Sequence, residues 1–150
     1  MAAGKFFVYT SALKYFTNGT INLDSDAIHA VPLHSGYTPS TGSHSAYAQI
    51  SDYRATASAT IINSITLSDS LITGSGAVSV KFDSDDVSGF SAGGDTFQVK
   101  YIALVHNTAT AAAQLIGFFD TDTGATTGVE GTQVNVTVPA GGWFKFNGNT

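Results

Sequence analysis

The clearest pattern of apolar and polar positions along the chain lies in residues 97–106, which are typical of one extended strand. Phe97 and every second residue up to Val105 share one face, because successive side chains of a strand point to opposite faces. Ile102 and Leu104 make the second half apolar on the other face too. A strand that is apolar on both faces is predicted to lie inside a sheet.

A second apolar run, residues 113–119, follows after only a short polar segment. That segment, residues 107–110, reads Asn-Thr-Ala-Thr and has the composition of a turn. Two strands joined by so short a connection form an antiparallel hairpin. The sequence therefore predicts a hairpin over residues 97–119.

One short helix is predicted over residues 11–19. Ser11 is expected to be its N-cap, and Ala12 shares a face with Phe16 four positions later. Gly19 is suited to the left-handed position that follows a helix. No other segment has apolar residues at helical spacing, so strands are predicted for the rest of the chain.

The remaining strands are short and are separated by turn residues. Residues 134–138 alternate strictly between valine and polar side chains, which indicates a strand with one wet face. Pro32 cannot donate a ladder hydrogen bond, so its strand is expected to be an edge or to contain a bulge. Further strands are predicted at residues 27–33, 47–50, 59–67, 77–82, 132–138 and 143–146.

Many short strands without intervening helices predict an all-β fold. We expect an antiparallel β-sandwich, jelly-roll-like, with one short N-terminal helix. Residues 1–150 are expected to form a single domain, in which residues 1–10 are either an N-terminal arm or the first strand. Residues 33–52 have no period, and a loop of that length is either a working loop or contains a missed strand.

Composition narrows the classes of function. Charged residues make up 11% of the chain and the net charge is -5, with the six basic residues scattered singly, so no basic stripe is available for nucleic acid. There are no cysteines, which excludes disulfides and thiolate zinc sites. No run is long enough for a signal peptide or a membrane span, so the product is expected to be soluble in the cell that makes it.

Catalysis is not predicted. Residues 89–93 match the G-x-S-x-G pattern around Ser91, but that motif needs a strand before the serine and a helix after it, and here a strand follows. His106 and Asp120 are expected not to be partners of Ser91. A Gly-rich hairpin loop is the preferred interpretation, and the protein is predicted not to be an enzyme.

Metal and cofactor binding are not predicted either. Asp120 and Asp122 resemble the start of a calcium loop, but Gly131 stands where the bidentate glutamate of an EF-hand belongs. A looser calcium site near Asp120 and Asp122 stays open. The four histidines lack the spacing of a metal pair and are expected to form hydrogen bonds in loops.

Aromatic residues among Ser, Gly and Thr point to a contact surface instead. Rigid aromatic side chains bury much area at little entropic cost, and few charged groups must be dehydrated around them. The segment from Phe6 to Tyr9 is equally compatible with a first strand that fills the core. The predicted contact residues are Phe6, Phe7, Tyr9, His34, Tyr37, Pro39, His44, Tyr47 and Tyr53.

Several segments, in order along nearly the whole chain, resemble small tailed-bacteriophage virion proteins, the decoration or cement proteins of the capsid. The resemblance covers the helix and its exit, the start of the long loop, the hairpin and the C-terminal aromatic tail. Its residues are Tyr15, Phe16, Gly19, Ile21, Leu23, Asp26, Ile28, Leu33, residues 36–39, His44, residues 93–94, residues 103–105, residues 108–110, residues 115–116, residues 120–124 and residues 139–142.

The resemblance implies a virion structural protein without enzymatic activity, made in the cytoplasm of the host bacterium. It implies a homotrimer on the outside of the capsid, where subunits of the major capsid protein meet, and no contact with nucleic acid or membrane. The alternative is a tail or baseplate adhesin or a carbohydrate-binding module that uses residues 37–53. A small hydrolase using Ser91 is a third hypothesis.

Overall fold

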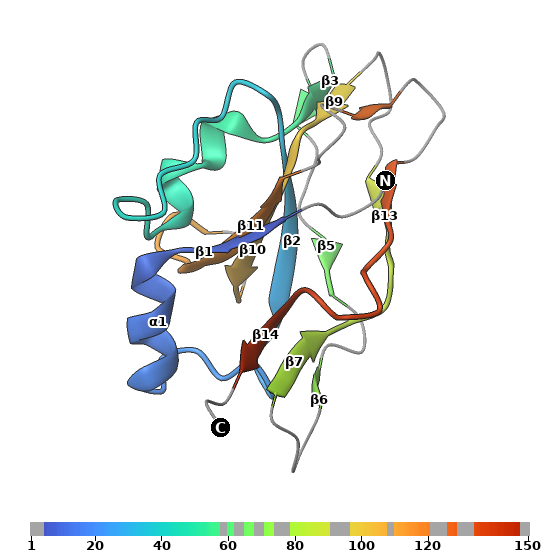
Figure 1. Cartoon of the computed structure of the whole chain (residues 1–150). Helices are drawn as coiled ribbons and strands as arrows, with labels where there is room; N and C mark the ends of the chain where they lie inside the picture. Colours follow the sequence, from blue (N-terminus) through green and yellow to red (C-terminus); the bar gives the residue numbers. More distant parts are fainter. Residues whose placement is uncertain are drawn as a thin grey trace.

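The computed structural model describes residues 5–57, 60–61, 65–67, 71–73, 79–90, 97–107, 110–120, 126–128 and 134–147. Over these ranges the chain forms mostly short strands in antiparallel sheets, with one short α-helix (Figure 1). The all-β class predicted from the sequence is therefore confirmed.

A five-stranded sheet forms the centre of the fold. The hairpin is confirmed: its two strands lie side by side, and Ile102 is opposite Phe119. Residues 102–106 are all buried, as expected for a strand with sheet on both sides. In order across the sheet, the strands are β1 (Phe6–Val8), β11 (Leu115–Asp120), β10 (Tyr101–His106), β2 (Ile28–Leu33) and β5 (Ile65–Thr66).

The strand predicted over residues 97–106 is divided at Lys100. Its first part, β9 (Phe97–Val99), joins a different sheet from β10. The backbone N–H of Lys100 donates to the carbonyl oxygen of Leu33 at 2.8 Å. Alternation continues through the break, so the sequence pattern alone could not reveal the change of partners.

Three smaller sheets complete the described strands. One contains β12 (Thr126–Gly128), β9, β3 (Thr56–Ala57) and β4 (Thr60–Ile61). Another pairs β13 (Val134–Val136) with β8 (Val87–Phe90), which the sequence did not predict as a strand. The last contains β14 (Phe144–Asn147), β7 (Ser79–Asp83) and β6 (Leu71–Thr73).

The central sheet separates two buried clusters, because alternate residues of β10 point to opposite faces. Ile102 and Leu104 belong to the cluster that includes Phe82 and Trp143, on the side of the smaller sheets. On the other face, side chains of the sheet pack against side chains of the long loop, residues 34–54, and form a second cluster. Its members are Tyr9, Ala12, Val31, Leu33, Tyr37, Tyr47, Ile50, Ala103, Val105, Ala113, Leu115 and Phe118.

Helix α1 (Thr10–Thr17) begins slightly earlier than expected. Tyr9 is its N-cap and Ser11 lies inside its first turn, so the assignment of Ser11 as N-cap is wrong. The backbone N–H of Thr10 is already bonded to Thr41 of the long loop, at 2.9 Å to its carbonyl oxygen. The C-terminal prediction is confirmed, because Gly19 has φ +74° after the C-cap residue.

Pro32 lies in β2, an interior strand, so the prediction of an edge strand is wrong. Its carbonyl oxygen accepts from Ala55 at 2.8 Å, on the side away from β10. The N and C=O of one strand residue point to the same side, so the missing N–H of Pro32 removes no bond to β10. In the described part of β5, pairing reaches only His29 and Ala30, which leaves Pro32 beyond it.

The long loop contains two 3₁₀-helices, η1 (Tyr47–Gln49) and η2 (Ser51–Tyr53). The strand predicted at residues 47–50 is therefore wrong. The Gln49 side-chain oxygen accepts the backbone N–H groups of Ser45 and Ala46, at 2.6 and 2.9 Å, and the backbone N–H groups of Gln49 and Ile50 donate to carbonyl oxygens three residues earlier. These donors are not available to a strand ladder. Only an isolated bridge joins Ala46 to Gln114.

Candidate functional site

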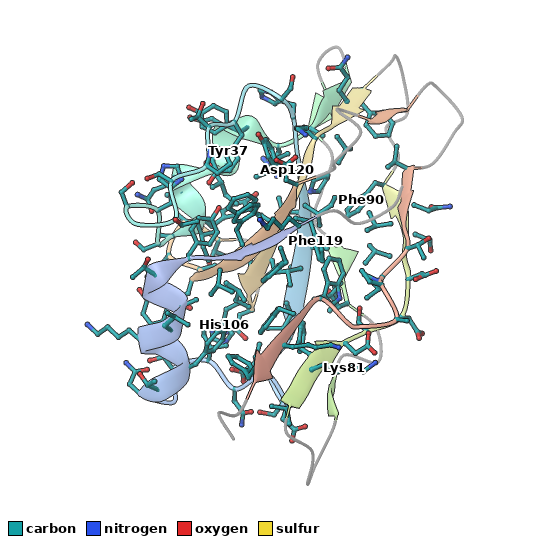
Figure 2. All side chains as sticks on the ribbon, viewed as in Figure 1. Tyr37, Lys81, Phe90, His106, Phe119 and Asp120 are labelled. Atoms are coloured by element: carbon teal, nitrogen blue, oxygen red, sulfur yellow. The ribbon has the colours of Figure 1, made fainter. Side chains whose placement is uncertain are left out.

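The first candidate is the predicted hydrolase constellation, which the described residues do not form. Ser91 lies outside them. His106 does not meet Asp120. Asp120 lies opposite Tyr101, at the other end of β10, and forms an ion pair with Lys100. Figure 2 shows His106 and Asp120 well apart along the sheet. Asp122, the second residue of the possible calcium site, also lies outside the described ranges.

His106 instead belongs to a partly buried polar cluster at the end of β10. Its Nε2 is 2.8 Å from Asp26 Oδ2, and its Nδ1 is 2.7 Å from Gln114 Oε1. The residue is 5% exposed. Both ring nitrogens are occupied, so neither is available to take a proton from a nucleophile without breaking this cluster.

Asp26 fixes a turn as well as the histidine. Its Oδ2 accepts the backbone N–H of Asn22 at 2.7 Å, and this bond, together with the bond from His106, holds the pKa of the Asp26 carboxyl below its usual value. The turn over residues 22–26 is thereby attached to the end of β10. This attachment joins residues 80 positions apart, which no local sequence pattern could have indicated.

The second candidate is a group of aromatic side chains under the 34–54 loop, the region in which Figure 2 labels Tyr37. The Tyr9 and Tyr37 hydroxyl oxygens lie 2.7 Å apart, and the Tyr37 hydroxyl is 2.8 Å from His44 Nδ1. Burial raises the pKa of both tyrosines, and the bond to Tyr37 adds to the effect on Tyr9. Tyr37 also packs edge-on against Tyr101, with ring centroids 5.7 Å apart. The loop is therefore anchored to the sheet by its own aromatic side chains.

Burial divides the predicted contact residues into two groups. Tyr9, Tyr37 and Tyr47 are 0%, 2% and 5% exposed, so they have almost no surface to offer a partner, and that part of the prediction is corrected. Phe7 and Tyr53 are each 37% exposed. Phe6, His34, Pro39 and His44 are half-buried, and with Phe7 and Tyr53 they remain predicted contacts.

The open question about residues 1–10 is resolved for the residues that the structure describes. Phe6–Val8 form β1, paired with β11, which is the first-strand interpretation. The Phe6 ring packs on Phe119 and Phe144, with both centroid distances at 5.0 Å. This segment therefore contributes to the core of its own chain, with Phe7 alone on the outward side.

The histidines form hydrogen bonds, but the prediction that all four do so from loops is wrong, because His29 and His106 lie in strands β2 and β10. The His34 ring accepts the N–H of Gly36 at 2.9 Å, and His29 lies 3.4 Å from the Thr66 hydroxyl. Burial lowers the pKa of His29. Among the residues that the structure describes, no three His, Asp or Glu side chains converge as metal ligands would.

The third candidate is a groove that the sequence analysis did not predict. It has a volume of about 600 Å³ and lies between the end of α1, the segment after it, and the β7–β14 pair. Phe146 is 37% exposed beside it. No motif marks these positions, because they come from three separate parts of the chain. The lining residues are Phe16, Gly19, Ile21, Asn22, Leu23, Asp24, Val80 and Phe146.

No helix in the described ranges has the length and apolar character needed to cross a bilayer. Comparison of the chain with family models, with curated proteins and with solved structures found no match. Function therefore has to be argued from the chain itself.

Proposed function

We propose that this chain is a structural protein of a tailed-phage virion, a capsid decoration protein that binds the outer surface of the shell where subunits of the major capsid protein meet. The observation that carries this proposal is the ordered resemblance to decoration proteins along nearly the whole sequence. It includes the helix exit around Gly19, the start of the long loop at residues 36–39, and the hairpin residues 103–105.

The fold is compatible with a rigid adhesive protein. The long loop, which a binding or catalytic protein often leaves adaptable, is held to the sheet by the Tyr9–Tyr37–His44 contacts. His106, the histidine that a hydrolase would require, has both ring nitrogens engaged. A surface with few charged groups is also favourable for burial against another protein, because little charge must be dehydrated.

The finer architecture is part of the same proposal. The central sheet on one side and the smaller sheets on the other form the two layers of a jelly-roll-like sandwich, and three copies associate as a trimer. A threefold trimer at a threefold junction contacts several shell subunits at once. Individually weak contacts then give firm binding through high effective concentration.

The direct test is co-sedimentation. Purified protein is mixed with capsids from the phage that encodes this chain, prepared without it, and the capsids are sedimented. We expect saturable binding with a stoichiometry that follows the number of equivalent junctions. Protein that stays in the supernatant at saturating capsid concentration, while it remains folded by circular dichroism, would contradict the proposal.

The alternative is an adhesin or a carbohydrate-binding module that uses residues 37–53 as its ligand surface. Within that loop, the Tyr37 ring is buried among Tyr53, Tyr101 and Phe118 and is 2% exposed, whereas Tyr53 is 37% exposed. A sugar stacking on Tyr37 is therefore the part of this alternative that the fold does not favour. A sugar ring could reach Tyr37 only if the loop left the sheet.

A further inference from the structure

The groove beside β14 is the described feature that the interpretation above does not use. Its volume, about 600 Å³, is in the range of sites that hold one or two side chains or a small ligand. Ile21 and Leu23 are 3% and 7% exposed, so they form a buried floor. Phe16, Val80 and Phe146 provide apolar walls. An apolar group bound there would lose contact with water on the side that faces this floor and these walls.

The walls of the groove are held by the fold. The Phe16 ring packs against Phe144 and Phe146, at centroid distances of 6.3 and 5.7 Å. The wall formed by residues 22–24 belongs to the turn that Asp26 fastens to His106. A groove that exists before binding does not have to be ordered by its ligand, which favours affinity.

The polar side chains at the rim of the groove differ in whether they already have a hydrogen-bond or ion-pair partner among the described residues. The Asn22 side-chain oxygen accepts the N–H of Asp24 at 3.1 Å, and Asp26 is bound to His106 and Asn22. In contrast, the described contacts include no partner for the Asp24 carboxylate, which is exposed. An anionic group beside an apolar groove favours a ligand that carries an apolar group and, close to it, a cation.

Strand β14 indicates what kind of molecule carries those groups. Its only strand neighbour in the described ranges is β7, and it lies between β7 and α1 (Figure 1). Phe146 of β14 and Val80 of β7 lie opposite each other and both line the groove, so the groove lies over this strand pair, beside the outer strand β14. An unpaired edge offers backbone N–H and C=O groups, and an extended peptide can add there as a further strand.

We propose that this groove and the β14 edge bind an extended segment of the capsid subunit, with an apolar side chain in the groove and a lysine or arginine two positions later facing Asp24. The spacing follows from the strand, since residues two apart share a face. This inference names the partner surface of the proposed decoration function and, for the identity of the partner, rests on it.

The chemistry of the groove is tested with a synthetic peptide as probe. Fluorescein-labelled Thr-Val-Thr-Leu-Thr-Lys-Thr is titrated with the protein, and anisotropy is measured. We expect saturation below about 1 mM. Serine in place of leucine should weaken binding about tenfold or more, and glutamate in place of lysine about fivefold. No saturation, or equal binding of the leucine and serine peptides, would overturn the proposal.

Variants of the protein locate the binding. Phe146→Ala should weaken binding of the leucine peptide about tenfold, whereas Tyr53→Ala, the same fraction exposed at 37% but on the long loop, should leave it unchanged. Asp24→Lys changes only an exposed turn side chain. It should weaken the lysine peptide and strengthen the glutamate peptide. Equal affinities of both peptides for both proteins would show that Asp24 is not part of the site.

Co-sedimentation with capsids separates this inference from the proposed function. If the peptide binds as expected but the protein does not bind capsids, the decoration function fails and the groove remains a peptide site. If the wild-type protein, Phe146→Ala and Asp24→Lys all bind capsids equally, the function stands and the groove is not the docking surface.

Discussion

At the scale of single residues, the hydroxyl of Tyr9 has the most constrained environment among the tyrosines described. The side chain is fully buried, and its hydroxyl meets the Tyr37 hydroxyl, which in turn meets the ring of His44. Ionisation of Tyr9 would place a charge in the core, which is why burial raises its pKa. The contact therefore depends on both hydroxyls keeping their protons.

We predict that stability decreases at alkaline pH and that Tyr9→Phe reduces this decrease. In the unfolded chain tyrosine ionises near pH 10, whereas in the fold the pKa of Tyr9 is raised, so the unfolded state loses protons first. The wild type therefore loses stability as the pH rises above about 10. At pH 8 the variant should be about 1 kcal/mol less stable, because a hydrogen bond is lost.

Urea unfolding at a series of pH values from neutral to alkaline provides the measurement. The two curves of unfolding free energy against pH should converge as the pH increases. Parallel curves would mean that Tyr9 is as easily ionised in the folded chain as in the unfolded one.

At the scale of elements, the pairing of β1 with β11 depends on close approach at Gly117. Val8 lies opposite Gly117 in the register, and the Phe6 ring crosses over the glycine. A Cβ at Gly117 would collide with the Phe6 ring and would lie 2.5 Å from the Phe7 carbonyl oxygen. The absent side chain is thus what allows the first strand to pack into the core.

We predict that Gly117→Ala lowers the free energy of unfolding by about 1–3 kcal/mol, the usual cost of overpacking a well-filled site. Gly42→Ala is the matched control, because no atom lies within 4 Å of a Cβ built there. Its effect should stay within about 0.5 kcal/mol. Thermal or urea unfolding of both variants measures the difference, and equal stabilities would contradict the packing argument.

At the scale of the whole molecule, the two faces of the central sheet are covered in different ways. One face packs against the smaller sheets, and the other is covered largely by a loop with two 3₁₀-helices. The exposed large apolar side chains, Phe7, Leu13, Tyr53 and Phe146, are distributed over β1, α1, η2 and β14.

A threefold assembly needs two different surfaces on each chain, one for each neighbour. Because the proposed function includes a trimer, we predict a light-scattering mass of three chains, either in solution or after release from capsids. The measurement is made over a range of protein concentrations, so that a weak trimer is seen as a rising mass. A constant single-chain mass in both samples would contradict the trimer, although not the binding to capsids.

Part of the fold could be predicted because it depends on neighbours in sequence. The hairpin over residues 97–119, the helix ending before Gly19 and the half-buried strand at residues 134–136 follow from alternation, helical spacing and turn composition. One error lies where a side chain engages the backbone. Gln49 accepts two backbone N–H groups beside η1, where the sequence predicted a strand.

The candidate site was less predictable. Aromatic composition led to the prediction of a contact surface on the long loop, but it could not distinguish Tyr37, which is buried, from Tyr53, which is exposed. The groove had no sequence signal, because Phe16, Leu23 and Phe146 are apolar residues like those of any core. Whether an apolar residue lines a core or an open groove depends on how much of its surface other elements cover.

By itself, the sequence determined the β class, the hairpin and the helix, because the period of apolar side chains and local backbone propensity depend on a few neighbouring residues. The tertiary structure alone decided the change of sheet at Lys100, the joining of His106 to Asp26 and the groove beside β14. Those features depend on contacts between segments far apart in the chain, and such contacts are formed only when the whole chain is folded.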